Sequence, residues 1–346
     1  MFFTSSDILL LSRRIKKSPR AIDEEFRGWN WNEPPIYSQH FSQTSVSELI
    51  YCSTLRNLYL RQKGYKVGEE SSLIKKGRAI HDTYSTAIST IKRLLYSSPQ
   101  IDGNKLKTLM TDEFYSFLKK YEDQADYVKT LWDYITNIYS AELDRVRSKF
   151  FNLTEDSLVS SVVPFYVEYP VDGSLVGLSS SLRIDAFVPF IPLIAEMKTG
   201  KYKYSHELQL AGYALAFESQ YEIPIDFGYL CYVNVDEKEV KSNCKLIQIS
   251  NSLRSEFLDK RDKALEIMDN VIDPGIANDC EKECPYYKLC HPSWLGRSAC
   301  SLFLLCGNFL GKRSKINSKS YIELKASCKL KNSAKHSIYF LIPPSR

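Results

Sequence analysis

Apolar residues in the first 150 positions recur at the three- and four-residue spacing of amphipathic helices. The pattern predicts one helix from Ser45 to about Lys63 and a second from near Gly77 to the Ser97-Ser98-Pro99 sequence. Two more helices are expected between residues 105 and 150. Cys52 falls inside the first helix or at its edge, and His81 falls in the first turns of the second.

After Thr154 the pattern changes to short runs rich in β-branched and aromatic residues, which are typical of strands. Strands are expected at residues 158–163, 165–169, 182–188, 193–198, 227–235 and 245–249, and helices at 205–219 and 253–271. A helical first half followed by a small mixed sheet with crossover helices indicates the α/β class. We therefore divide the chain into a helical N-terminal region (1–150), a mixed core (151–295) and an unassigned tail (296–346).

Composition adds few constraints. The 346 residues are 44% hydrophobic and 25% charged, as in a globular protein with a sizeable core. A net charge of +5 permits phosphate binding without requiring it. No run of eighteen or more apolar residues and no signal-peptide pattern is present, so we expect a cytoplasmic protein with no membrane partner.

Two neighbouring predicted strands carry the main candidate for chemistry, with Asp185 in the first and Glu196-Met197-Lys198 in the second. If the strands are adjacent and antiparallel, Glu196 and Lys198 share one face and Asp185 can approach them from the neighbouring strand. Two carboxylates would then bind Mg²⁺ or Mn²⁺, and Lys198 could orient a water or stabilise charge on phosphate.

A solvent-exposed hairpin is the simpler interpretation of this motif, because a Glu-x-Lys pair is common. The neighbours of Asp185 and Glu196 favour the catalytic interpretation. They include Ile184, Phe187 and Ile194, and carboxylates among apolar side chains are costly unless a cation or another partner satisfies them.

Two further candidates flank this motif. Gln209 and Tyr213 are spaced to share one helical face directly after the second strand, where an amide and a phenol suit contact with a nucleotide. A half-buried tyrosine on an ordinary helix surface is the alternative. His81 could add an imidazole to a metal site, although a lone histidine is more often structural.

Cysteine spacing gives the last candidate. Nine cysteines without a secretion signal argue against a disulfide framework. Cys280, Cys284 and Cys290 form a C-x3-C-x5-C run, and Cys52 could supply a fourth thiolate. Zinc is the competing occupant of a four-thiolate site.

The candidate residues occur in a fixed order along the chain: Cys52, His81, Asp185, Glu196, Lys198, Gln209, Tyr213, Cys280, Cys284 and Cys290. This order resembles RecB-like PD-(D/E)xK nucleases with a 4Fe-4S cluster, and especially the CRISPR-associated exonuclease family four in its archaeal Csa-type variant. The opening segment 24–31 also resembles the start of that subfamily, so the resemblance covers about residues 1–295.

The resemblance implies a restriction-endonuclease-type core that an iron–sulfur cluster holds to the helical region. It implies Asp185, Glu196 and Lys198 as catalytic residues, with His81 joining the two carboxylates around Mg²⁺ or Mn²⁺. The cluster ligands would be Cys52, Cys280, Cys284 and Cys290, and the DNA contacts Gln209 and Tyr213.

The activity implied by the resemblance is exonucleolytic cleavage of DNA with single-stranded ends, before insertion of the fragments into a CRISPR array. The integrase and other adaptation proteins are the implied partners. Two alternatives stay open: a non-catalytic subunit that binds DNA ends, and a zinc-stapled interaction module. The chain departs from many relatives in placing three residues, not two, between Cys280 and Cys284.

Overall fold

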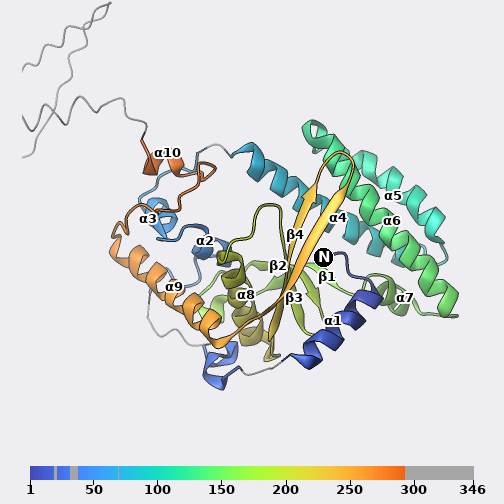
Figure 1. Cartoon of the computed structure of the whole chain (residues 1–346), viewed down its shortest axis with the longest axis horizontal. Helices are drawn as coiled ribbons and strands as arrows, with labels where there is room; N and C mark the ends of the chain where they lie inside the picture. Colours follow the sequence, from blue (N-terminus) through green and yellow to red (C-terminus); the bar gives the residue numbers. More distant parts are fainter. Residues whose placement is uncertain (19–21, 32–37, 69, 293–346) are drawn as a thin grey trace, which may run out of the picture. The chain divides into compact units, whose positions relative to one another are not determined.

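A five-stranded mixed sheet lies at the centre of residues 1–292, which form one compact unit in this computed structural model (Figure 1). The structure describes residues 1–18, 22–31, 38–68 and 70–292, and the tail 296–346 lies outside them. The strands are β1 (Tyr166–Val171), β2 (Leu182–Val188), β3 (Leu193–Lys198), β4 (Phe227–Val235) and β5 (Val240–Gln248), in that spatial order. Neighbouring strands are antiparallel except for the parallel pair β3 and β4, which helix α8 connects.

The sheet separates two hydrophobic cores (Figure 1). The helices that pack in the first core are α1 (Ser5–Lys17), α4 (Ser72–Ser97), α5 (Gly103–Leu118), α6 (Ala125–Lys149) and α7 (Glu155–Val162). Those in the second core are α2 (Val46–Tyr51), α3 (Arg56–Gln62), α8 (Ser205–Tyr221) and α9 (Asn251–Asn270). A short helix, α10 (Tyr287–Cys290), follows. These observations confirm the α/β class with a helical N-terminal region.

Alternate residues of strand β3 point to opposite sides of the sheet. Leu193, Ala195 and Met197 belong to the first core, whereas Ile194 belongs to the second. The two-residue period of a strand therefore directs Glu196 and Lys198 toward the side of α8. Strand β2 pairs antiparallel with β3, as the sequence predicts.

The segment 158–163 was expected to be a strand, and this is wrong, because it lies in helix α7 and the residue after it. Thr154 caps the helix by accepting a hydrogen bond from the backbone N–H of Ser157. Leu158 and Val162, one turn apart, are both buried in the first core. A favourable cap and tertiary burial outweigh the β-branched composition of this stretch.

The boundaries of two other helices differ from those expected. Helix 45–63 is broken into α2 and α3, because Leu55 adopts a left-handed backbone conformation with φ of 64°. Cys52 is the C-cap of α2. Helix α4 begins at Ser72, where the side chain of Ser71 caps it, so His81 lies deeper in the helix than expected.

Cys231 and Cys244 form a disulfide that the sequence did not indicate. They are directly opposite each other on β4 and β5, with Cα atoms 4.0 Å apart. Their spacing along the chain carries no signal, since only the strand register brings them together. Within the described residues, no helix combines the length and apolar character needed to cross a bilayer.

Candidate active site and cysteine group

Asp185 is anchored through one carboxylate oxygen and leaves the other available. Its Oδ2 accepts a hydrogen bond of 2.7 Å from the backbone N–H of Met197 on the neighbouring strand. Its Oδ1 lies 3.6 Å from Nδ1 of His81, which lies on helix α4. The structure therefore brings His81 and Asp185 together, as the sequence analysis proposed.

Glu196 is the most deeply buried of the candidate residues, with 1% of its surface exposed. Its Oε2 accepts hydrogen bonds from Nε2 of Gln209 at 3.0 Å and from Nζ of Lys198 at 3.3 Å. Its Oε1 is buried and has no partner among the described residues. Burial and then the nearby Asp185 carboxylate raise the pKa of Glu196 well above its usual value, while Lys198 opposes the shift.

Gln209 and Tyr213 lie on one face of α8, but that face points inward. They are 3% and 6% exposed. Gln209 uses both ends of its amide, because its Oε1 also accepts a 2.6 Å hydrogen bond from Lys198. Burial, followed by the charges of Glu196 and Asp185, raises the pKa of the Tyr213 phenol. In this structure Gln209 is a positioning residue, and DNA contact by the pair stays a prediction.

His206 belongs to the same site and was missed in the sequence. It lies on α8 before Gln209, and its Nδ1 is 2.7 Å from the hydroxyl of Tyr232 on β4. Burial lowers the pKa of His206 to about 4, with Lys198 and Lys203 acting in the same direction. The i, i+3 spacing of His206 and Gln209 was the available signal, since it places both on one side of the helix.

Glu168 is the second residue that sequence reasoning missed. It lies in β1 at a φ of 48°, in the left-handed region that few residues other than glycine adopt. Burial and then the charge of Asp185 raise the pKa of Glu168, whereas His81 and Arg183 lower it. Nothing in the sequence marks this residue, because a backbone angle leaves no pattern in the residue types.

The structure places the four predicted cluster cysteines in one region, although they span much of the chain. All four are free thiols. Burial raises the pKa of Cys280 to about 11, and Cys284, Cys290 and Cys52 act in the same direction. Contacts between the two parts of the chain support the group, since Arg56 donates two hydrogen bonds to Asp273 at 2.9 and 2.7 Å.

The donors present can be tested against the groups that the resemblance implies. Within the described parts of the chain, no three His, Cys, Asp or Glu side chains lie close enough together to coordinate a metal ion. The types of donor nevertheless fit. An orphan buried oxygen on Glu196, a free oxygen on Asp185 and the imidazole of His81 suit Mg²⁺ or Mn²⁺. Four thiols suit an iron–sulfur cluster or zinc.

Comparison with known proteins shows the family. A family model described as "CRISPR-associated exonuclease Csa1" matches residues 1–293. The chain belongs to the Csa1 family. It is 69% identical over 293 residues to the CRISPR-associated exonuclease Csa1 of Saccharolobus solfataricus, which covers 84% of this chain and 100% of that protein. It is 28% identical over 291 residues to the protein of the same name from Thermoproteus tenax, covering 82% and 96%.

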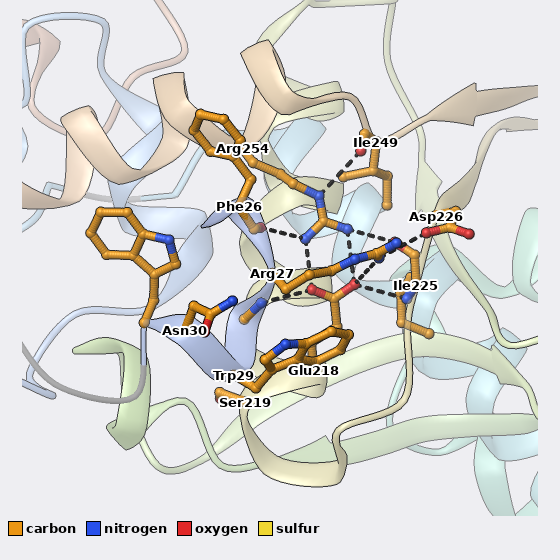
Figure 2. A network of polar contacts seen from close by, with 12 residues as sticks. Phe26, Arg27, Trp29, Asn30, Glu218, Ser219, Ile225, Asp226, Ile249 and Arg254 are labelled. Carbon is orange, nitrogen blue, oxygen red and sulfur yellow. Dashed lines mark hydrogen bonds and ion pairs between the residues drawn. The ribbon is translucent and has the colours of Figure 1, made fainter. Parts of the chain in front are cut away.

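The Csa1 match includes the opening segment 24–31, and the structure gives this segment a physical role. Figure 2 shows Arg27 and Arg254 converging on Glu218, which is fully buried near the end of α8. Glu218 also accepts hydrogen bonds from the backbone N–H groups of Gly28 at 2.8 Å and Ile225 at 2.9 Å. A Cβ atom at Gly28 would lie 2.1 Å from the oxygen of Leu215, so the close approach requires glycine.

This buried network, formed by Arg27, Glu218, Asp226 and Arg254, fixes the C-terminal end of the helix whose other half carries Gln209 and Tyr213. In this Csa1-family chain the opening segment therefore supports the site from a distance. A charge buried with this many partners is satisfied, whereas removal of one partner would leave others unpaired.

Proposed function

We propose that this chain is a metal-dependent exonuclease that degrades DNA with single-stranded ends, and that it processes fragments for CRISPR spacer acquisition. The observation that carries the proposal is the buried carboxylate of Glu196. Lys198 and Gln209 hold one of its oxygens, and the other has no hydrogen-bond partner among the residues that the structure describes. Such an oxygen is costly in a protein interior unless a cation meets it.

His81, Asp185 and Glu196 would hold the cation through the imidazole and the two available carboxylate oxygens. A bound Mg²⁺ or Mn²⁺ supplies a water of lowered pKa and offsets charge on the phosphate. Met197 fixes the Asp185 carboxylate from the backbone, so its other oxygen is directed at His81. This set, on neighbouring strands with Gln209 on the next helix, supports a RecB-like core as part of the proposal.

The ammonium of Lys198 has a separate task. Nζ donates to the neutral amide of Gln209 and lies 3.3 Å from the Glu196 carboxylate, so its position is fixed beside the cation site. From there it stabilises negative charge that develops on the scissile phosphate and orients the attacking water. Preorganised charge of this kind acts without rearrangement during the reaction.

We propose further that Cys52, Cys280, Cys284 and Cys290 bind a 4Fe-4S cluster with a structural task. The cluster would join the end of α2 to α10 and the segment before it, which are far from α2 in the sequence. After burial, neighbouring cysteines, among them Cys284 and Cys52, help to raise the pKa values of Cys280 and Cys290, which supports this assignment. The proposed partners are the CRISPR integrase and other adaptation proteins, in keeping with the names of the Csa1 relatives.

Digestion of end-labelled single-stranded DNA tests the nuclease proposal. Anaerobically purified wild type is compared with Asp185→Ala and Lys198→Ala, with Mn²⁺ or with a chelator. We expect metal-dependent shortening from the ends in the wild type and a loss of more than about a hundredfold in both variants. The matched control is Asp133→Asn, on the exposed surface of α6.

Equal cleavage by all these proteins would point to a contaminant or to a different site. No cleavage by cluster-loaded wild type, together with retained binding of DNA ends, would favour the alternative of a non-catalytic DNA-end-binding subunit.

A further inference from the structure

Glu168 and Asp185 occupy opposite positions on β1 and β2 at a break in the hydrogen-bonded ladder. The antiparallel register pairs Val167 with Ala186 and Tyr169 with Ile184, and it passes over the position where Glu168 and Asp185 would be opposite. The pairing of β2 with β3 begins at Ala186 and Ala195, so Asp185 also lies beyond that ladder. Instead, the Asp185 side chain accepts the backbone N–H of Met197.

At this position, the alternation of side chains between the two faces of the sheet is reversed in both β1 and β2. In β2, Ile184 belongs to the second core and Ala186 to the first, although a regular strand would place them on one face. In β1, Val167 packs against the first core and Tyr169 against the second. Two neighbouring strands thus reverse their alternation together, at the two residues that carry carboxylates.

Glu168 is held in an unfavourable conformation at this level. The other non-glycine residues with a positive φ in the described part of the chain lie in loops or at helix ends. They are Ser42, Leu55, Asn152, Glu222 and Val271. Glu168 alone among the described residues does so inside a strand. Strain of this kind persists where the surroundings impose it, and it is concentrated at functional sites.

The described residues compensate the charges at this position only in part, because Nδ1 of His81 lies 3.6 Å from Oδ1 of Asp185, beyond hydrogen-bond distance. Like charges opposite each other on neighbouring strands destabilise a sheet. Arg183 does not compensate directly, because its Nη1 donates to the backbone oxygen of Glu168 at 3.5 Å and not to the carboxylate. A cation between Glu168 and Asp185 would remove the conflict, and Oδ1 of Asp185 is the oxygen that Met197 leaves available.

We propose that Glu168 is a further ligand of the nuclease cation, bound from β1 directly or through one water, opposite Asp185. This inference rests on the proposed function, since it adds one carboxylate to the site formed by His81, Asp185 and Glu196. The additional oxygen brings the donor set closer to the six positions that Mg²⁺ and Mn²⁺ prefer.

The test is the affinity for Mn²⁺ of the full chain without DNA, read from the EPR signal of free Mn²⁺. Glu168→Gln keeps the shape of the side chain and removes its charge, and we expect it to weaken binding about tenfold or more. Glu222→Gln is the matched control, because Glu222 also has a positive φ of 53° but lies exposed at the end of α8. We expect its affinity to equal that of the wild type.

Thermal unfolding of the metal-free proteins separates a ligand from a merely structural residue. Glu168→Gln should unfold at the same or a higher temperature than the wild type, since it removes repulsion from Asp185. Glu168→Gly, which relieves the positive φ, should also fold at least as stably while losing Mn²⁺ affinity. A lower unfolding temperature in both, with Mn²⁺ affinity unchanged, would overturn the inference.

The proposed function and this inference can fail separately. If the wild type does not bind Mn²⁺, both are wrong. If Asp185→Asn loses Mn²⁺ and Glu168→Gln binds as the wild type does, the cation site stands and Glu168 is not part of it.

Discussion

Lys198 is bound more closely by Gln209 than by Glu196. Its Nζ lies 2.6 Å from Oε1 of Gln209 and 3.3 Å from Oε2 of Glu196. The other end of the same amide donates to Glu196 at 3.0 Å, so one side chain orients both the ammonium and the carboxylate. Because the amide is neutral, it fixes Lys198 without neutralising the charge that would act on phosphate.

Replacement of Gln209 should therefore affect turnover more than substrate binding. We expect Gln209→Ala to lower kcat by about ten- to a hundredfold with little change in KM, since a supporting residue of the site is lost. Steady-state digestion of labelled single-stranded DNA measures both constants. Gln220→Ala, on the exposed side of the same helix, is the control. A raised KM with unchanged kcat would instead show that Gln209 contacts DNA.

Much of the candidate site could be predicted because its residues follow the period of regular structure. Glu196 and Lys198 alternate on β3, and Gln209 and Tyr213 are one turn apart on α8, so sequence spacing alone predicted which faces they share. The antiparallel neighbour that carries Asp185 also followed from the short turn between the two strands.

The residues that could not be predicted depend on register and backbone angle. Glu168 lies opposite Asp185 only because β1 pairs with β2 at a particular register, and its positive φ has no signature in residue type. Cys231 and Cys244 are likewise joined by register. The strand prediction for segment 158–163 was wrong because its composition suits strands, whereas the cap at Thr154 and the packing of α7 favour a helix.

Loss of Glu218 should destabilise the whole protein. Glu218 and Arg254 are fully buried, and Glu218→Gln would leave the charge of Arg254 without its carboxylate partner, while Arg27 keeps only Asp226. We expect a loss of about 3–5 kcal/mol in the free energy of unfolding, measured by urea denaturation. Asp133→Asn breaks an exposed ion pair with Lys129 and should cost less than about 1 kcal/mol. A comparable small effect at Glu218 would contradict the structural role given to this network.

Protonation of His206 should make stability depend on pH. Its pKa is lowered from 6.5 to about 4 in the folded protein, chiefly by burial, so below 6.5 the unfolded chain binds the proton more readily. The stability that the neutral ring contributes is complete above about pH 6.5 and is lost as pH falls toward 4. Urea denaturation at several pH values in this window, with wild type and His206→Gln, measures it. We expect a shallower loss of stability in the variant, and parallel curves would argue against a buried neutral His206.

Iron content should distinguish variants of the four free cysteines from variants of the disulfide. Cys280 and Cys284 are free thiols beside one another, whereas Cys244 is joined to Cys231 across β4 and β5. After anaerobic purification we expect both the wild type and Cys244→Ser to contain iron and to absorb light at about 400 nm, as cysteine-bound clusters do. Cys284→Ser should lose most of the iron and unfold at a lower temperature, because the cluster no longer joins α2 to the segment before α10. Zinc without iron in the wild type would mean that the same four thiols hold a different metal.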